Sequence, residues 1–188
     1  MGYTRAELES FRDATIPDLV EPGVRLLFVG INPGLWTAAT GTPFARPGNR
    51  FWPALVEAGM LPRLPRYAEA LSAEDRRMII DAGIGVSNLV ARATARADEL
   101  SRDELRAGAV TLAKRVAQWR PRAVAVVGLT AYRQGFDRPR AVAGRQHETI
   151  ADVPTWVLPN PSGLNAHDTV TTLARAYAEP ARAAGVLA

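Results

Sequence analysis

The sequence contains no cysteine, and only one lysine and two histidines stand among its 188 residues. The lack of cysteine excludes disulfide bonds, iron–sulfur clusters and thiolate zinc sites. The two histidines, His147 and His167, cannot form a three-ligand metal centre without carboxylates. We therefore expect neither a metal ion nor any other cofactor.

Long apolar runs are also missing. No stretch approaches the roughly 18 apolar residues of a membrane span, and the N-terminal residues 1–4 lack a signal-peptide pattern. These absences predict a cytoplasmic protein with no membrane partner. A chain of this length buries roughly 70% of its unfolded surface. Because no composition shift marks a boundary, we expect a single domain over residues 1–188, present as a monomer.

The charge is positive, with a formal net charge of +4 and a sequence pI of about 10.1. Nearly all basic residues are arginine, and Lys114 is the only lysine. Arginine suits phosphate because its planar guanidinium donates paired hydrogen bonds. A bias toward arginine over a whole chain also arises from coding preference. The charge therefore permits a nucleic-acid partner without proving one.

Strand and helix patterns alternate along the chain, and the residues between 31 and 49 are rich in Gly, Pro and Thr. A loop of that length inside a compact domain is usually functional. The alternation predicts a three-layer α/β/α fold with a central, mainly parallel sheet. The expected strands are 24–29, 83–90, 123–127, 147–150 at an edge, and 155–158. The expected helices are 4–13, 50–58, a short one from 72, 101–119, 130–136 and 169–184.

Two short motifs follow predicted strands: Gly-Ile-Asn-Pro-Gly at 30–34 and Asn-Pro-Ser-Gly-Leu at 160–164. Ligands of open α/β sheets bind at the carboxyl ends of the strands, so both motifs are expected in one cleft. The first motif is not a dinucleotide fingerprint or a phosphate-binding Walker loop, and the chain has no Gly-x-Ser-x-Gly nucleophile elbow. Nucleotide-dependent enzymes and serine hydrolases are thereby disfavoured.

These motifs, in this order, resemble those of the mismatch-specific uracil-DNA glycosylase and thymine-DNA glycosylase family. The resemblance adds Pro-Phe-Ala at 43–45, Asn-Arg-Phe-Trp at 49–52 and Gly-Ile-Gly-Val-Ser-Asn-Leu-Val at 83–90. It implies a uracil-DNA glycosylase-like fold and a repair enzyme that removes uracil, or related pyrimidines, mispaired with guanine in double-stranded DNA. No lysine stands in a catalytic motif to form a Schiff base, so no lyase step is expected.

By this resemblance, Asn32 orients the water that attacks the sugar C1′ atom. An enzyme that acts on a base must flip it out of the duplex into a pocket with a stacking surface, which Phe44 can supply. Because an asparagine side chain is not a base, the loss of general-base help predicts a slow enzyme, by about 10²- to 10⁴-fold. The remaining expected pocket residues are Gly30, Ile31, Pro33, Gly34 and Asn88.

The resemblance also implies a wedge near the C-terminus, where Leu164 enters the duplex and fills the space left by the flipped nucleotide. The family's acidic residue after the middle strand is missing here, and Asp98 a few residues beyond is a candidate accessory catalytic group. Ser162 is a candidate phosphate contact. The other expected wedge and DNA-backbone residues are Asn160, Pro161, Gly163, Asn165, Arg46 and Arg50.

Two alternatives remain. A non-catalytic protein on the same scaffold would bind mismatches or lesions and shield them, and such a binder would survive the loss of Asn32. A hydrolase of free nucleosides is disfavoured, because Leu164 and the basic charge would serve no purpose in it.

Overall fold

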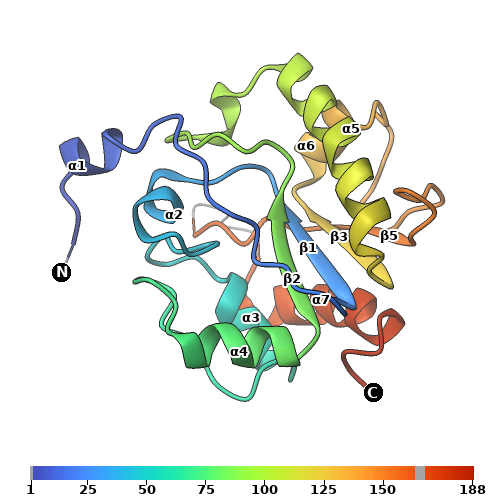
Figure 1. Ribbon diagram of the computed structural model, residues 1–188. Helices are drawn as coiled ribbons and strands as arrows, with labels where there is room; N and C mark the ends of the chain where they lie inside the picture. The colour runs from blue at the N-terminus through green and yellow to red at the C-terminus, as the bar shows by residue number, and fades with distance from the viewer. Residues whose placement is uncertain (1, 164–167) are drawn as a thin grey trace.

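A five-stranded sheet organises the protein, and the computed structural model describes residues 2–163 and 168–188 (Figure 1). The strand order is β2-β1-β3-β5-β4. The first four strands in this order run parallel, and only β4 is antiparallel to its neighbour. The strands are β1 (Leu26–Gly30), β2 (Ile84–Asn88), β3 (Ala123–Val127), β4 (Gly144–Arg145) and β5 (Thr155–Leu158).

Helices cover both faces of this sheet. One face carries α3 (Phe51–Glu57), α4 (Ala73–Asp81) and α7 (Val170–Ala183), and the opposite face carries α5 (Arg102–Trp119) and α6 (Leu129–Gly135) (Figure 1). Strands buried on both faces need apolar side chains in continuous runs, and β1 and β3 have them. The predicted three-layer α/β/α architecture with a mainly parallel sheet is confirmed.

Each face of the sheet has its own hydrophobic core. Phe28, Trp52 and Tyr177 belong to the core under α3 and α7, and all three are fully buried. Leu112 and Val126 belong to the core under α5 and α6. Side chains alternate between the two faces of a strand, so β1 and β3 contribute to both cores.

Helix starts follow the capping patterns of the sequence. Thr4, Ser101 and Thr169 form capping boxes at the starts of α1 (Arg5–Glu9), α5 and α7. The first helix is shorter than the expected 4–13. Asp13 adopts a left-handed conformation with φ 62° and its N–H donates to Ala93 O at 2.9 Å, so the chain leaves the helix to pair with that segment.

Two other expectations about elements were wrong. The stretch 31–49 is not a continuous loop, because α2 (Leu35–Thr40) begins after Gly34 and ends at Gly41, whose φ of 66° favours glycine. The edge strand is β4 rather than 147–150. Residues 150–153 instead form a tight turn, in which Ile150 and Val153 pair with each other.

The topology brings the two motifs to one edge of the sheet. Gly30 at the end of β1 pairs with Asn88 at the end of β2. Leu158 at the end of β5 pairs with Val127 at the end of β3. Because all four strands are parallel, their carboxyl ends lie at the same edge. Within the described residues, no helix has the length and apolar character needed to cross a bilayer.

Candidate functional site

A small cavity of about 160 Å³ lies at this carboxyl edge. That volume equals the share of about five liquid waters at about 30 Å³ each, which is room for one six-membered ring with its exocyclic atoms. The two sequence motifs and the Pro-Phe-Ala segment meet around it. The lining residues are Ile31, Asn32, Pro33, Gly34, Thr37, Pro43, Phe44, Arg46, Asn49, Asn88, Ala97, Val127, Asn160 and Ser162.

The side chain of Asn32 is fixed by both hydrogens of its amide nitrogen. Nδ2 donates to Arg92 O at 2.9 Å and to Thr94 Oγ1 at 2.7 Å. A backbone carbonyl can only accept, so the nitrogen must be the atom that faces Arg92 and the amide cannot be flipped. Among the described residues, no donor reaches the Asn32 carbonyl oxygen. Oδ1 therefore remains available to accept a hydrogen bond in the cavity.

The segment after β2 that holds Asn32 is itself anchored. The Thr94 side chain is 1% exposed, and its hydroxyl donates to Arg96 O at 2.8 Å. Arg92 binds Glu104 through two hydrogen bonds of 2.5 and 3.2 Å, and Asp13 at 3.0 Å. The Arg92 guanidinium, with hydrogen bonds from Ser101, lowers the pKa of the Glu104 carboxyl to about 2. This network gives Asn32 a rigid support.

Phe44 occupies an unusual backbone position beside the cavity. Its φ of 56° is uncommon for a residue with a large side chain and costs roughly 1–2 kcal/mol. Its ring stacks on Phe51 with centroids 4.0 Å apart and planes 22° from parallel. The Trp52 indole donates to Pro43 O at 2.9 Å and holds the preceding residue. Packing therefore offsets the backbone strain and fixes an aromatic ring in the cavity wall.

Gly30 and Asn88 meet at the floor of the site. A Cβ atom at residue 30 would lie 2.9 Å from Asn88 Oδ1 and 3.4 Å from Phe44 Cζ, so a larger residue there would displace the Asn88 amide. Arg115 fixes the end of β2, since Nη2 donates to Asn88 O at 2.8 Å and Nη1 donates to Ser87 Oγ at 3.0 Å. The Asn88 amide can both donate and accept, as the edge of a pyrimidine requires.

Arg50 joins the two loops on the far side of the cavity. Its N–H donates to Pro161 O at 3.0 Å, and its guanidinium donates to Asp168 O at 2.7 Å. Asn160 Oδ1 accepts from Ser162 N at 3.0 Å, and a Cβ atom at Gly163 would lie 2.8 Å from Gly48 O. Residues 160–163 thus pack tightly against residues 48–50.

Most of the site residues expected from the sequence line the cavity, and some do not. Gly30 lies beneath it, and Arg50, Pro161 and Gly163 hold the loops around it. Asp98 does not line it: its side chain is 62% exposed and pairs with Arg96 at 2.5 Å. Leu164 and Asn165 lie outside the described residues.

Sequence reasoning missed several residues of the site. Thr37, Pro43, Asn49, Ala97 and Val127 line the cavity. The motif spacing contained a signal for Pro43 and Asn49, which belong to the quoted segments 43–45 and 49–52. No sequence signal pointed to Thr94, because its hydrogen bond with Asn32 spans 62 residues.

The chemistry open to this site is limited by its polar groups. Among the described residues that line the cavity, none is a carboxylate or a histidine. The described part of the chain also contains no group of three or more His, Asp or Glu side chains that could hold a metal ion. The site therefore offers amides, two hydroxyls, an aromatic ring and one guanidinium, which can position reactants and stabilise negative charge.

Comparison with known proteins agrees with this description. The sequence model of the Uracil DNA glycosylase superfamily matches residues 17–180. The fold is similar to the solution NMR structure of a protein proposed to be a uracil DNA glycosylase, from Methanosarcina acetivorans. That match has a TM-score of 0.62 at 15% sequence identity, and covers 90% of this chain and 96% of the other.

Proposed function

The chain belongs to the Uracil DNA glycosylase superfamily, and from this premise we propose that it hydrolyses the N-glycosidic bond of uracil mispaired with guanine in double-stranded DNA. Thymine and modified pyrimidines opposite guanine are further substrates of this proposal. The reaction has no lyase step and needs no cofactor.

The observation that carries the proposal is the fixed amide of Asn32. Both amide hydrogens are engaged by Arg92 O and Thr94 Oγ1, so Oδ1 is held in one orientation in the cavity wall. A water that donates to Oδ1 directs a lone pair at C1′ of the flipped nucleotide. As the water oxygen bonds to C1′, the C1′–N1 bond breaks and its electron pair leaves with uracil as an anion. The proton of the attacking water passes to solvent.

The cavity size and lining support a single pyrimidine as the group that is bound. A volume of about 160 Å³ is below the ~300–1,000 Å³ of typical ligand pockets, which fits a base and leaves the sugar outside. The Phe44 ring offers a stacking face, and the Asn88 amide pairs with the polar edge of the base. Preorganised donors around the departing anion lower the barrier without reorganisation.

A flipped base requires a support for the distorted duplex. We assign this role to residues 160–165, with Leu164 as the side chain that fills the vacated space. Arg50, at the start of α3, contacts Pro161 within this wedge segment and Asp168 beyond it. Arg46, at the mouth of the cavity, is assigned to the DNA backbone. Asp98 keeps only an accessory role, because it pairs with Arg96 at the surface.

Single-turnover base release tests the proposal. Wild-type protein is incubated with duplexes that contain G:U, A:U, G:T or no lesion. We expect release from G:U to be fastest, and we expect Asn32→Ala to lower its rate by roughly 10²- to 10⁴-fold without loss of G:U binding. Leu164→Ala should weaken the duplex complex. An unchanged thermal unfolding temperature of Asn32→Ala is the control for folding.

The alternative is a lesion-binding protein with no catalytic activity. It predicts tight G:U binding by the wild type with no release of uracil, and no effect of Asn32→Ala on that binding. Turnover of free deoxyuridine at a rate comparable with that of DNA would instead support a nucleoside hydrolase and contradict the proposal.

A further inference from the structure

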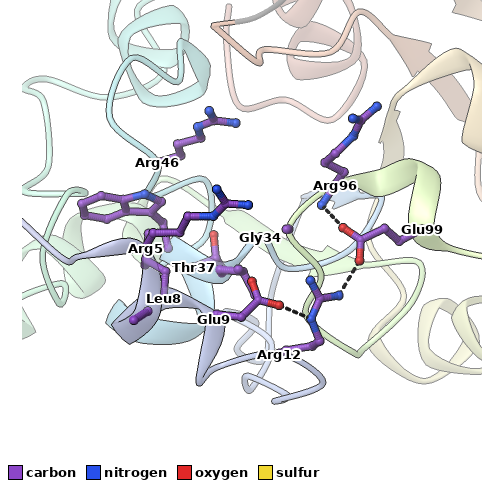
Figure 2. A pocket seen from close by; sticks show the side chains of 13 residues that line it. Arg5, Leu8, Glu9, Arg12, Gly34, Thr37, Arg46, Arg96 and Glu99 are labelled. Atoms are coloured by element: carbon purple, nitrogen blue, oxygen red, sulfur yellow. Dashed lines mark hydrogen bonds and ion pairs between the residues drawn. The ribbon is translucent and has the colours of Figure 1, made fainter.

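A second, larger cavity opens beside the base-sized one. Its volume is about 870 Å³, and it lies between α1, α2 and residues 95–99, which include η1 (Ala97–Glu99) (Figure 2). Gly34, Thr37 and Arg46 line both cavities. We call the larger one the α1 groove. Because the two cavities share three lining residues, they adjoin each other.

One wall of the α1 groove comes from a segment outside the superfamily match. That match begins at residue 17, whereas α1 covers Arg5–Glu9. The segment is nevertheless well attached. The ring of Tyr3 meets that of Trp36 edge to face at 5.2 Å, and Arg12 binds both Glu9 and Glu99. The segment before residue 17 is therefore packed onto the rest of the protein and forms a defined wall of the groove. The superfamily activity does not explain why this wall is present.

The charges around the α1 groove favour an anion. Its lining holds four arginines against two acidic residues, Glu9 and Glu99, and both carboxylates are paired with Arg12 (Figure 2). Arg5 and Arg46 form no ion pair with any residue in the described ranges. Arg96 pairs with Asp98, but both side chains are more than half exposed and such a pair is weak in water. In Figure 2 the guanidinium groups of Arg5, Arg46 and Arg96 lie apart from the Arg12 ion pairs, with Arg46 at the upper left and Arg96 at the upper right.

Part of the groove lining is apolar. Leu8, Leu35 and Trp36 contribute to it. A positively charged groove with aromatic and apolar surface is the composition of sites that bind single nucleic-acid strands, where phosphates meet cations and bases or sugars rest on the apolar wall. The groove is also more than five times the size of the base cavity, which suits a nucleotide rather than a base.

We propose that the α1 groove binds the nucleotide that adjoins the flipped nucleotide on the same DNA strand. Its phosphate lies against Arg5 and Arg46, and its sugar and base lie on the wall formed by Leu8 and Trp36. This assignment rests on the proposed function, because it places the flipped base in the small cavity. It adds a strand contact that depends on the segment before residue 17.

The test compares Arg5→Gln with Arg76→Gln. Arg76 is exposed on α4, lines neither cavity, and loses the same charge. Binding of a G:U duplex is measured in the Asn32→Ala background at several salt concentrations, so that catalysis does not enter. Loss of one phosphate contact should reduce the slope of log K against log salt by about 0.9 for Arg5→Gln. Arg76→Gln should leave the slope as it is.

A second arm locates the nucleotide. The uracil nucleotide is placed at the 5′ end or at the 3′ end of its strand, so that one neighbour is missing. The effect of Arg5→Gln should disappear in one of these duplexes and persist in the other.

Three results would overturn the assignment: equal slopes for the two variants, an Arg5 effect that survives the loss of either neighbour, or Arg5-dependent binding of thymidine monophosphate without any change in the DNA slope. The last result would identify a site for free nucleotides. A wild type that binds the duplex but releases no uracil would refute the proposed function alone, since the salt slopes are measured without catalysis.

Discussion

At the scale of single residues, the support of one amide decides whether the site can work. Asn32 can position water only if its side chain is held, and Thr94 supplies one of its two hydrogen-bond acceptors at 2.7 Å. Thr94 does not line the cavity, so it acts through Asn32 as a positioning residue. The Thr94 hydroxyl also donates to Arg96 O, and this hydrogen bond fixes the orientation of the hydroxyl that accepts from Asn32.

Thr94→Val should therefore slow uracil release without weakening binding. The substitution keeps the side-chain shape but removes a hydrogen bond worth about 0.5–1.5 kcal/mol, which corresponds to roughly 2- to 12-fold in the single-turnover rate. The dissociation constant of the G:U duplex should stay the same. Thr94→Ser, which retains the hydroxyl, should restore most of the rate; equal losses in both variants would contradict the positioning role.

At the scale of elements, the start of α5 is coupled through Glu104 to the segment that holds Asn32. This residue completes the capping box with Ser101, whose N–H donates to it at 2.9 Å, and it also binds Arg92. Hydrogen bonds from Arg92 and Ser101 lower its pKa from the ordinary 4.5 to about 2. A carboxyl with a lowered pKa stabilises the folded state above pH 4.5, and this stabilisation is lost as the pH falls toward 2.

Glu104→Gln should thus be destabilising at pH 7, and the difference from the wild type should shrink between pH 4.5 and pH 2. Glutamine still accepts a hydrogen bond at the cap, so the lost charge is the main change. Urea unfolding at pH 7, 5, 4 and 3 measures it. Glu57→Gln on α3, which removes an exposed charge in no ion pair with a described residue, is the matched control. A destabilisation that stays constant over this range would exclude the charge as its cause.

At the scale of the whole molecule, the sheet separates two hydrophobic cores, and we expect them to stabilise the protein independently. Ile79 on α4 lies in one core and Leu112 on α5 in the other, and both are 0% exposed. Sites far apart with no shared partners contribute additively to the free energy of unfolding, within about 0.3–0.5 kcal/mol. The smaller cavity lies at the carboxyl edge of the sheet that separates these cores.

The double substitution Ile79→Val with Leu112→Ala measures this independence. We expect about 0.5–1.5 kcal/mol of destabilisation from the first and about 2–5 kcal/mol from the second, because each leaves a cavity in a fully packed core. The double variant should equal the sum of the two single variants. A coupling above about 1 kcal/mol in urea unfolding would show that the sheet transmits strain between the layers.

Much of the fold and part of the site could be predicted because their signals are local. Apolar runs predicted β1, β3 and β5 to within two residues, and the capping box at Ser101 predicted where α5 begins. The order of the motifs indicated the superfamily that the match over residues 17–180 shows. Helix caps, and the alternation of side chains between the two faces of a strand, depend on neighbours within a few residues. The sequence by itself therefore determined them.

Only the tertiary structure decided how the site is held and what lies beside it. The amide of Asn32 depends on Arg92 and Thr94, 60 and 62 residues away, and Asp98 turns to Arg96 instead of the cavity. The α1 groove exists because Tyr3 packs on Trp36 and Arg12 binds Glu99. These contacts join segments distant along the chain, and no local pattern encodes them. They arise because close packing leaves each side chain one set of partners.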